Sequence, residues 1–275
     1  MNFFDVAILN PIINILLLSY QIVFSLHIPY PLGFSIILLT IVIRLILYPL
    51  TGAQLKASKK MQDLNPHIKN LKEKHKGDAK TLQAETMRLY KEHGVNPAAG
   101  CLPVLIQLPV IWGLYSVLIK IVQLGPNTVN EVNKIAYYDF LKLTKVWDTN
   151  FFGIPLGQNP SQLFSSIGVL IILVPLATAA FQFIQSKMML PVVSASDKKL
   201  STEKKGEKKP DDFATAFQTQ SLYIFPIMIG FFSYTFPIGL SLYWNTFTIF
   251  GIMQQYKISG LGGLKEWKDK LNGKK

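Results

Sequence analysis

Long apolar stretches alternate with basic, polar segments along this sequence, and the apolar stretches have the length of membrane-spanning helices. A helix needs about 20 mostly apolar residues to cross the hydrocarbon core of a bilayer. The stretches that reach or approach this length are residues 32–50, 102–124, 163–190, 217–232 and 238–256. The fourth is the weakest of them, because polar residues dilute its start. The pattern therefore predicts an all-α membrane protein with five transmembrane helices.

Residues 6–26 form a further apolar stretch, with polar residues spread through it. No Lys or Arg precedes this stretch, so it lacks the basic start of a signal peptide. Pro11 suits the first turn of a helix, and Asn10 suits the cap before it. We interpret residues 6–26 as an amphipathic helix that lies in the outer interface of the membrane, with a sixth transmembrane helix as the alternative.

Lys and Arg are distributed unevenly among the segments that join the apolar stretches, and this distribution predicts the topology. Residues 51–100 contain ten of them, residues 187–210 seven and residues 257–275 six, whereas residues 125–160 contain three. Because cytoplasmic segments carry the excess of positive charge, the three basic segments should face the cytoplasm and residues 125–160 should face outside. Five spans then place the N-terminus outside and the C-terminus in the cytoplasm.

The composition agrees with a membrane protein, since 49% of the residues are apolar, 16% are charged and the formal net charge is +12. A soluble globular protein has about 25% charged residues, so the composition argues against an ordinary cytosolic enzyme. Cys101 is the only cysteine, which excludes an intramolecular disulfide bond and a cysteine-cluster metal site. The four histidines show no metal-binding spacing and no phosphate-binding loop is present, so we expect neither a metal nor another cofactor.

Three polar segments lie between or after the spans, and each has a different expected structure. Residues 56–93 predict a mobile cytoplasmic hairpin of two charged helices that meet at Gly77, because their apolar stripe is thin. Residues 191–212 are rich in lysine and predict a disordered cytoplasmic loop. Residues 257–275 form a basic C-terminal tail. We expect these segments and the spans to form a single domain.

Arg44 lies near the middle of the first predicted span. A charge at the centre of a bilayer costs about 2.5–3.5 kcal/mol on insertion scales. Every Asp and Glu lies outside the five predicted spans, so no carboxylate within the membrane can pair with Arg44. We therefore expect a water-filled cavity lined by polar side chains around this residue. The alternative is an arginine that is hydrogen-bonded to helix carbonyls and has only a structural role.

Polar side chains within the spans are the candidates to line such a cavity. Thr40 lies one helical turn before Arg44, on the same face of the helix. The other candidates are Gln107 in the second span, Gln182 and Gln185 in the third, and Ser241, Trp244 and Asn245 in the fifth. Each residue alone is more typical of a contact between helices. Together with an arginine at similar depth, they predict a hydrophilic groove within the membrane.

Two long stretches and a shorter one resemble the signature of the YidC-type membrane protein insertases. They are LLTIVIRLILYPLTGAQLKASKKMQDLNPHI, the later LYKEHGVNPAAGCLPVLIQLPVIWGLY, and the last span with GLSLYW and MQQY. The resemblance covers nearly the whole chain, with the motifs in the same order. It implies five transmembrane helices around a hydrophilic groove, an outer interfacial amphipathic helix and a cytoplasmic helical hairpin.

The resemblance also assigns roles to individual residues. The groove arginine of the family falls on Arg44, its threonine on Thr40 and its groove aromatic on Trp244. The groove glutamines correspond to Gln107 in the second span and to either Gln182 or Gln185 in the third.

The resemblance implies an insertase and membrane chaperone of the bacterial plasma membrane, with nascent membrane proteins as substrates and no need for a nucleotide. It leaves the ribosome and the Sec translocon open as partners, and we expect a monomeric core in the lipid bilayer. A channel or secondary transporter is the alternative function, but coupling usually uses intramembrane Asp or Glu, and no inverted repeat is visible. An intramembrane enzyme is disfavoured because all four histidines lie outside the spans.

Overall fold

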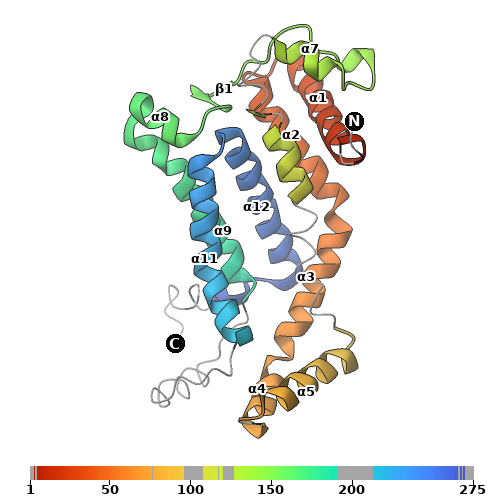
Figure 1. Cartoon of the computed structure of the whole chain (residues 1–275), viewed down its shortest axis with the longest axis vertical. Helices are drawn as coiled ribbons and strands as arrows, with labels where there is room; N and C mark the ends of the chain where they lie inside the picture. The colour runs from red at the N-terminus through yellow and green to blue at the C-terminus, as the bar shows by residue number, and fades with distance from the viewer. Residues whose placement is uncertain are drawn as a thin grey trace. The chain divides into compact units, whose positions relative to one another are not determined.

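The computed structural model describes most of the chain as helices with one small β-hairpin (Figure 1). The residues that it describes are 3, 5–75, 77–95, 108–116, 118–119, 127–190, 213–265, 267 and 269.

The chain divides into two compact units. Unit 1 comprises Met1–Leu47, Pro103–Phe181 and Ile227–Phe250, and unit 2 comprises Tyr48–Leu102, Gln182–Pro226 and Gly251–Lys275.

Unit 1 begins with two helices that pack along each other. A π-helical turn (Asp5–Leu9) leads into α1 (Asn10–Ser25), which is followed by α2 (Pro31–Ile46). Both α-helices have a proline in their first turn, where the missing N–H has no helical partner to lose. The core between them is apolar, and the side chains in it that are fully buried are Leu16, Leu17, Leu32, Ile36 and Leu39.

A third helical segment, residues 108–116 and 118–119, packs against the N-terminal end of α1. A Cβ atom at Gly113 would lie 3.3 Å from side-chain carbons of both Leu9 and Ile12. The glycine therefore allows the two backbones to approach closely. This segment is the described part of the predicted span 102–124, and Gln107 lies outside the described residues.

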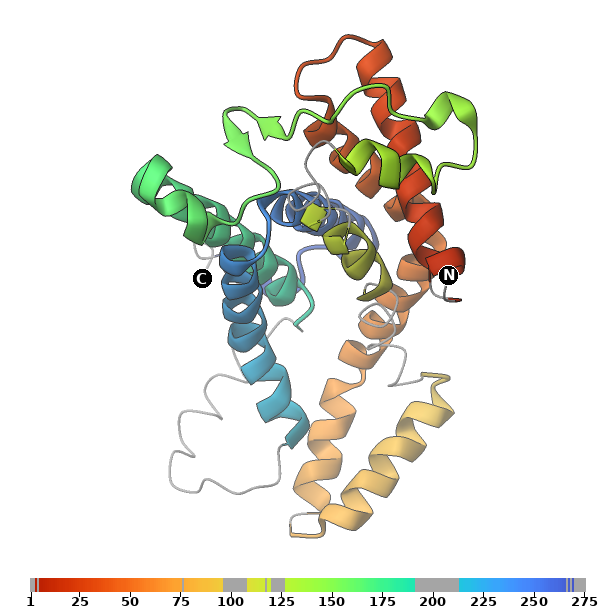
Figure 2. The same cartoon turned by 45° about the horizontal axis from the view of Figure 1, so that its top comes forward.

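Residues 127–155 form an irregular segment over α1 and the start of α2 (Figure 2). The segment contains α7 (Thr128–Asn133), a 3-10 turn (Asp139–Leu141) and the antiparallel strands β1 (Asn150–Phe151) and β2 (Ile154–Pro155). The ring of Phe151 lies on Gly33, where a Cβ atom would clash with it. Only glycine at that position of α2 lets the hairpin pack there.

The remaining long helices each contribute one part to each unit. α8 (Pro160–Ile167), a 3-10 segment (Gly168–Ile172) and α9 (Leu173–Met188) follow one another without a gap, and α11 (Phe213–Thr235) and α12 (Ile238–Ser259) come after them. Asn159 and Gln162 form a capping box at the start of α8. The predicted spans 163–190, 217–232 and 238–256 fall on these helices.

Two described helices are long and apolar enough to cross a membrane, namely Asp5–Ser25 and Pro160–Met188. The pair Pro31–Ile46 and Tyr48–Asp63 passes the same test of length and composition only when its two members are taken as one broken span. Leu222–Thr235 is a shorter apolar helix. Five transmembrane helices therefore stay a prediction, and the length of Asp5–Ser25 suits an interfacial helix as well as a sixth span.

Unit 2 contains the predicted cytoplasmic hairpin, which differs from the prediction in the number of its helices. The helices are α3 (Tyr48–Asp63), α4 (Asn65–Lys74) and α5 (Ala79–Glu92). Pro66 and Pro49 account for the breaks at Leu64 and Leu47, because proline lacks an N–H and starts a helix better than it continues one. The first predicted span, 32–50, is therefore divided, and its last three residues belong to α3.

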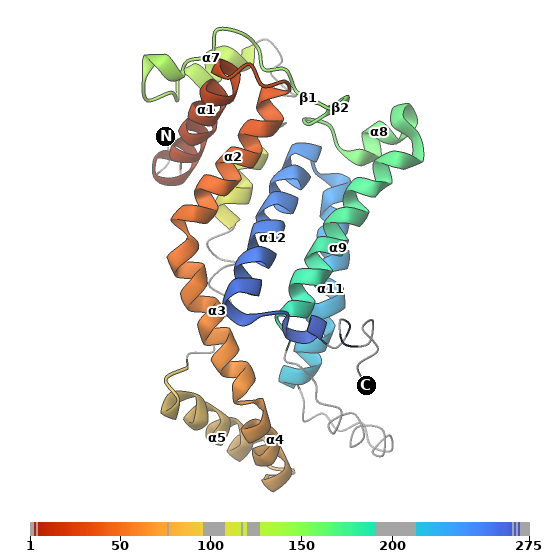
Figure 3. The same cartoon turned by 180° about the vertical axis from the view of Figure 1, so that it is seen from behind.

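The end of α9 and the first part of the tail 257–275 also belong to unit 2. The backbone N–H of Gly263 donates to the carbonyl of Leu190 at 2.9 Å, and the Trp267 ring lies 5.8 Å from that of Phe183. Figure 3 shows the turn that follows α12 beside the end of α9. The predicted basic tail thus begins as ordered structure. The predicted loop 191–212 lies outside the described residues.

Candidate functional site around Arg44

Arg44 lies in the last turn of α2, and its side chain is only 4% exposed. Its Nη2 donates a hydrogen bond to the carbonyl of Phe247 on α12. The guanidinium carbon lies 3.3 Å from the centroid of the Phe247 ring and 5.9 Å from that of Phe250. A guanidinium over an aromatic face gains electrostatic attraction from the ring. One residue of α12 thus holds the arginine with both its backbone and its side chain.

No described carboxylate forms an ion pair with Arg44. The ion pairs seen between described side chains lie elsewhere, at Arg88, Lys134 and Lys142, and join residues three or four apart on exposed segments. In addition, Nε of Arg44 is buried without a hydrogen-bond partner among the described residues. An arginine with only a structural role is expected to bond helix carbonyls, and the bond to the Phe247 carbonyl is of this kind. That bond nevertheless leaves the Nε–H of the guanidinium without an acceptor among the described residues. An uncompensated buried charge costs several kcal/mol, so a role beyond packing must be considered.

Thr40 is fully buried one helical turn before Arg44. Its hydroxyl donates to the carbonyl of Ile36 at 2.6 Å, a bond within the helix that leaves oxygen lone pairs available. Thr40 can therefore still accept a hydrogen bond from a polar group that reaches Arg44.

The three candidates on α12 differ in their surroundings. Ser241 is buried and shares a hydrogen bond of 2.8 Å with Ser233 on α11, which in turn donates to Thr178 on α9 at 3.2 Å. This chain of hydroxyls holds three helices together in unit 1, so Ser241 has a packing role. Trp244 and Asn245 are half-buried, and Oδ1 of Asn245 is buried with no hydrogen-bond partner in the described part of the chain.

Gln182 and Gln185 lie on the part of α9 that belongs to unit 2, and both are half-buried. Nε2 of Gln182 lies 3.4 Å from the hydroxyl of Ser186, four residues later in the same helix. Arg44 thus contacts α12 within unit 1, whereas Gln182 and Gln185 belong to unit 2.

Two contacts were not anticipated from the sequence. The first is Phe247, whose position three residues after Trp244 in an apolar span gave no sign of a role. The second is Gln254, which is buried near the end of α12 and donates to the Tyr48 carbonyl at 3.0 Å and to the Thr51 hydroxyl at 2.8 Å. Gln254 joins α12 to α3 within unit 2. Its signal was the MQQY sequence, in which two amides interrupt an otherwise apolar helix end.

No metal site accompanies this arrangement in the described residues, since no three His, Cys, Asp or Glu side chains come close enough together to hold an ion. The chemistry that the site offers is therefore a fixed cation with hydrogen-bonding groups near it.

Comparison with known proteins gives a consistent result. Residues 23–262 match the family described as "60Kd inner membrane protein". A protein named "Membrane protein insertase YidC" from Fusobacterium nucleatum is 32% identical, over 84% of this chain and 87% of its own length. The "Membrane protein insertase MisCA" of Bacillus subtilis is 34% identical, over 83% and 70%.

A chloroplast relative and a solved structure are longer than the matched region. The "Inner membrane protein ALBINO3" of Arabidopsis thaliana is 36% identical over 88% of this chain, which spans 49% of that protein. A crystal structure titled "Active YidC insertase crystal structure with the first transmembrane domain resolved" matches 93% of this chain and 47% of its own, with a TM-score of 0.51 and 26% identity. The chain thus spans about half the length of these two proteins. The resemblance predicted from the sequence is confirmed, and the chain belongs to the family of the YidC-type membrane protein insertases.

Proposed function

We propose that this chain is a membrane protein insertase and chaperone, which carries polar tails of nascent membrane proteins past the hydrocarbon and releases their spans into lipid. The observation that carries the proposal is the buried guanidinium of Arg44, which has no carboxylate partner among the described residues and is fixed by Phe247. The names of the bacterial relatives support it.

In this mechanism, the Arg44 guanidinium binds the polar tail of the substrate transiently while the tail crosses the membrane. A tail that crosses hydrocarbon alone pays the full cost of desolvating its charges. Arg44 attracts acidic residues of the tail, while Thr40, Trp244 and Asn245 offer hydrogen bonds. The apolar span of the substrate then leaves sideways, driven by burial of its own surface in lipid. No nucleotide enters any of these steps.

The proposal keeps the other groove candidates, Gln107, Gln182, Gln185 and Ser241, as residues to test. It also keeps the five-span topology in a bacterial plasma membrane, with the N-terminus outside and the C-terminus in the cytoplasm. The proposal keeps the ribosome and the Sec translocon as partners to test, with the hairpin 56–93 receiving substrates and the tail 257–275 contacting the ribosome. Contacts of the tail with RNA phosphates would weaken steeply as salt rises.

Site-specific photo-crosslinking to a stalled nascent chain tests the groove. A crosslinker is placed at the half-buried positions 244, 245, 182 and 185, at position 107, and at the exposed position 144 as a control. Crosslinks from 244 and 245 to the polar tail, and none from 144, would support the proposal. A tail that crosslinks equally at every position, or at none of them, would contradict it.

A further inference from the structure

Three aromatic side chains are exposed together on the irregular segment of unit 1. Tyr137, Tyr138 and Phe140, here called the aromatic patch, are 53%, 63% and 64% exposed. The rings of Tyr138 and Phe140 stack with their centroids 5.6 Å apart and their planes at 20°. Exposed aromatic side chains are costly in water, so a cluster of them indicates a surface that contacts something else.

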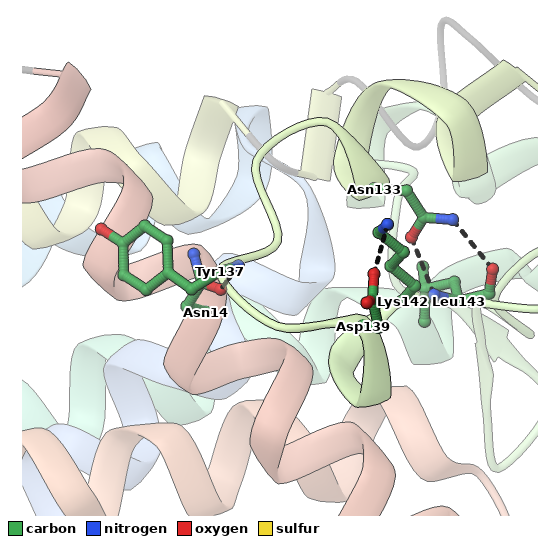
Figure 4. Close-up of polar contacts among 6 residues, drawn as sticks. All are labelled: Asn14, Asn133, Tyr137, Asp139, Lys142 and Leu143. Carbon is green, nitrogen blue, oxygen red and sulfur yellow. Dashed lines mark hydrogen bonds and ion pairs between the residues drawn. The ribbon is translucent and has the colours of Figure 1, made fainter.

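The patch is held on a rigid base. Oδ1 of Asn14 accepts from the backbone N–H of Tyr137 at 2.7 Å, and its Nδ2 donates to the carbonyl of Ile135 at 3.0 Å. Figure 4 shows Asn14 beside Tyr137 and Asn133 hydrogen-bonded to Leu143. Asn133 makes the same two-way contact with Leu143, at 2.7 and 2.9 Å. The two asparagines bracket the segment on both sides of the aromatic residues. The rings are therefore presented by a fixed backbone.

The charges around the patch cancel one another. Lys134 lies 2.6 Å from Glu131, and Lys142 lies 2.6 Å from Asp139. The hydrogen bond and the charge of Lys142 hold the pKa of Asp139 below its ordinary value, so this carboxyl stays ionised at neutral pH. Residues 127–155 also contain Lys145 and Asp148, so the segment carries three cations and three anions and has no net attraction for an acidic surface. Contact with a partner must come from the aromatic rings.

The neighbouring surface of α1 is apolar and runs up to this segment. Leu18, Ile22 and Leu26 form a stripe that is 43%, 44% and 65% exposed. In contrast, the polar side chains of Asn14 and Ser19 are buried and hydrogen-bonded within the protein. The buried polar side chains of the helix thus lie among buried apolar ones, and its outward stripe is apolar, unlike that of a helix that faces water.

The segment and the stripe are joined by a hydrogen bond. Nε2 of Gln21, the residue before Ile22, donates to the carbonyl of Lys142 at 3.2 Å. The aromatic patch therefore lies beside the apolar stripe. An apolar band bordered by aromatic residues and paired charges is the arrangement found where a protein surface passes from hydrocarbon to lipid headgroups.

We infer that the aromatic patch is a membrane-contact site that inserts Tyr137, Tyr138 and Phe140 into the headgroup region of the bilayer, beside hydrocarbon contacted by Leu18, Ile22 and Leu26. The partner is the lipid surface. Because the positive and negative charges of the segment balance, the contact does not depend on anionic lipids. The site does not need insertase activity, and only its assignment to the outer leaflet depends on the proposed topology.

Nitroxide labels can measure this insertion directly. In the full chain with Cys101→Ser, a label is attached to Tyr138→Cys or, separately, to Phe140→Cys, and the protein is placed in phosphatidylcholine bilayers. Asn130→Cys and Thr144→Cys, which are exposed and polar, are the matched controls. Labels at 138 and 140 should collide more with oxygen than with a water-soluble nickel complex, and labels at the controls should do the reverse. Adding phosphatidylglycerol should change neither result.

Three outcomes would overturn the inference. They are labels at 138 and 140 as water-accessible as the controls, burial that appears only with anionic lipid, and burial that depends on protein concentration, which would indicate a second copy. The same labelled chains are assayed for insertion of a model substrate. Buried labels in a chain that inserts nothing would refute the proposed function alone, while exposed labels in an active chain would refute the membrane contact alone.

Discussion

The sequence contains two arginines, and the structure places them in opposite environments. Arg88 lies on α5, in the helical hairpin of unit 2, with its side chain 68% exposed, and it bridges to Glu92 at 2.8 Å and to Glu85 at 3.7 Å. Arg44 on α2 is 4% exposed, and a carbonyl and an aromatic ring take the place of carboxylates. The pairing with Glu92 raises the pKa of Arg88, so its charge is satisfied where it stands.

The difference separates a charge that supports a helix from a charge that, in the proposed function, attracts a substrate. An exposed pair of residues four apart contributes little to stability and has no unmet electrostatic demand. A buried cation without a carboxylate is expensive, and a protein of this kind is expected to keep it for a function. The same substitution at Arg44 and at Arg88 should therefore affect insertion to different extents, and each prediction below tests one side of this contrast.

The largest effect is expected from Arg44→Ala. Insertion of single-span substrates with two acidic residues in the tail should fall by about tenfold or more, since losing an attraction of ~1.4 kcal/mol is a factor of ten. Substrates with neutral tails should be spared, Arg44→Glu should be worse than Ala for acidic tails, and Arg44→Lys should retain much of the activity. The measurement is the inserted fraction in liposomes for tails with zero, one or two acidic residues.

Arg88→Ala is the matched control for this experiment, because it removes the same side chain from an exposed site. We expect no dependence on tail charge for this variant. An equal loss for all three tails with Arg44→Ala would remove the electrostatic role and leave Arg44 as a group that hydrates the site.

A smaller effect is expected at Phe247, which fixes the guanidinium. Phe247→Leu keeps an apolar side chain and the carbonyl contact but removes the ring. A cation–π contact is worth about 1 kcal/mol, so insertion of acidic tails should fall by roughly fivefold, again with neutral tails spared. Phe247→Tyr keeps the ring and should restore most of the activity. If Leu and Tyr at this position behave alike in the liposome assay, the ring does not position Arg44.

Much of this site followed from the sequence, because single-residue chemistry decides it. A lone arginine in an apolar stretch without acidic residues needs no tertiary structure to be recognised, and Thr40 follows from helical spacing. The corner at Gly77, with its φ of 91°, was also visible as a glycine between two charged helices.

The rest depends on contacts between segments that are distant in sequence. Phe247 resembles any lipid-facing aromatic residue until α12 packs beside α2 and puts its ring under Arg44. The sequence interpretation of residues 6–26 as an amphipathic helix would place Asn14 on the polar face that contacts water. In the structure, Asn14 instead forms hydrogen bonds with residues 135–137, which lie 121 or more positions later in the chain. Pro49 and Pro66 were local signals for the helix breaks at Leu47 and Leu64. The long apolar stretch 32–50 and the charged stretch that follows it nevertheless predicted uninterrupted helices there.

Asn14 is a third case to compare with the two arginines, because it is buried and polar like Arg44 but both ends of its amide are hydrogen-bonded. Asn14→Ala would leave the Tyr137 N–H and the Ile135 carbonyl without partners, at a cost of about 1–3 kcal/mol. We expect faster proteolysis between residues 134 and 142 and a lower unfolding temperature in lipid nanodiscs, with no change in preference for acidic tails. Gln21→Ala, which removes a single exposed hydrogen bond, is the control and should have little effect. A change in tail preference would contradict the separation of structural from functional polar residues.

The smallest effect is expected at the start of α5, on the hairpin that carries Arg88. Asp78 caps this helix by accepting from the backbone N–H of Thr81 at 3.0 Å. Hydrogen bonding from the Thr81 side chain, and then from its backbone N–H, lowers the pKa of Asp78 below its ordinary value of 3.8. Because the folded-state pKa is lowered, the stabilisation by the cap is fully present above the ordinary pKa of 3.8 and is lost as pH falls through the folded-state pKa, which lies below 3.8. Asp78→Ala should speed amide hydrogen exchange in the first turn of α5 by roughly fivefold at pH 7, and Asp78→Asn, an equally good cap, should not. Insertion should be unchanged in both variants if the hairpin's charges serve only local structure. If Asp78→Ala lost insertion and Asp78→Asn kept it, the substrate would need an ordered hairpin. The two arginines would then differ only in their electrostatic roles, and both of the segments that carry them would serve insertion.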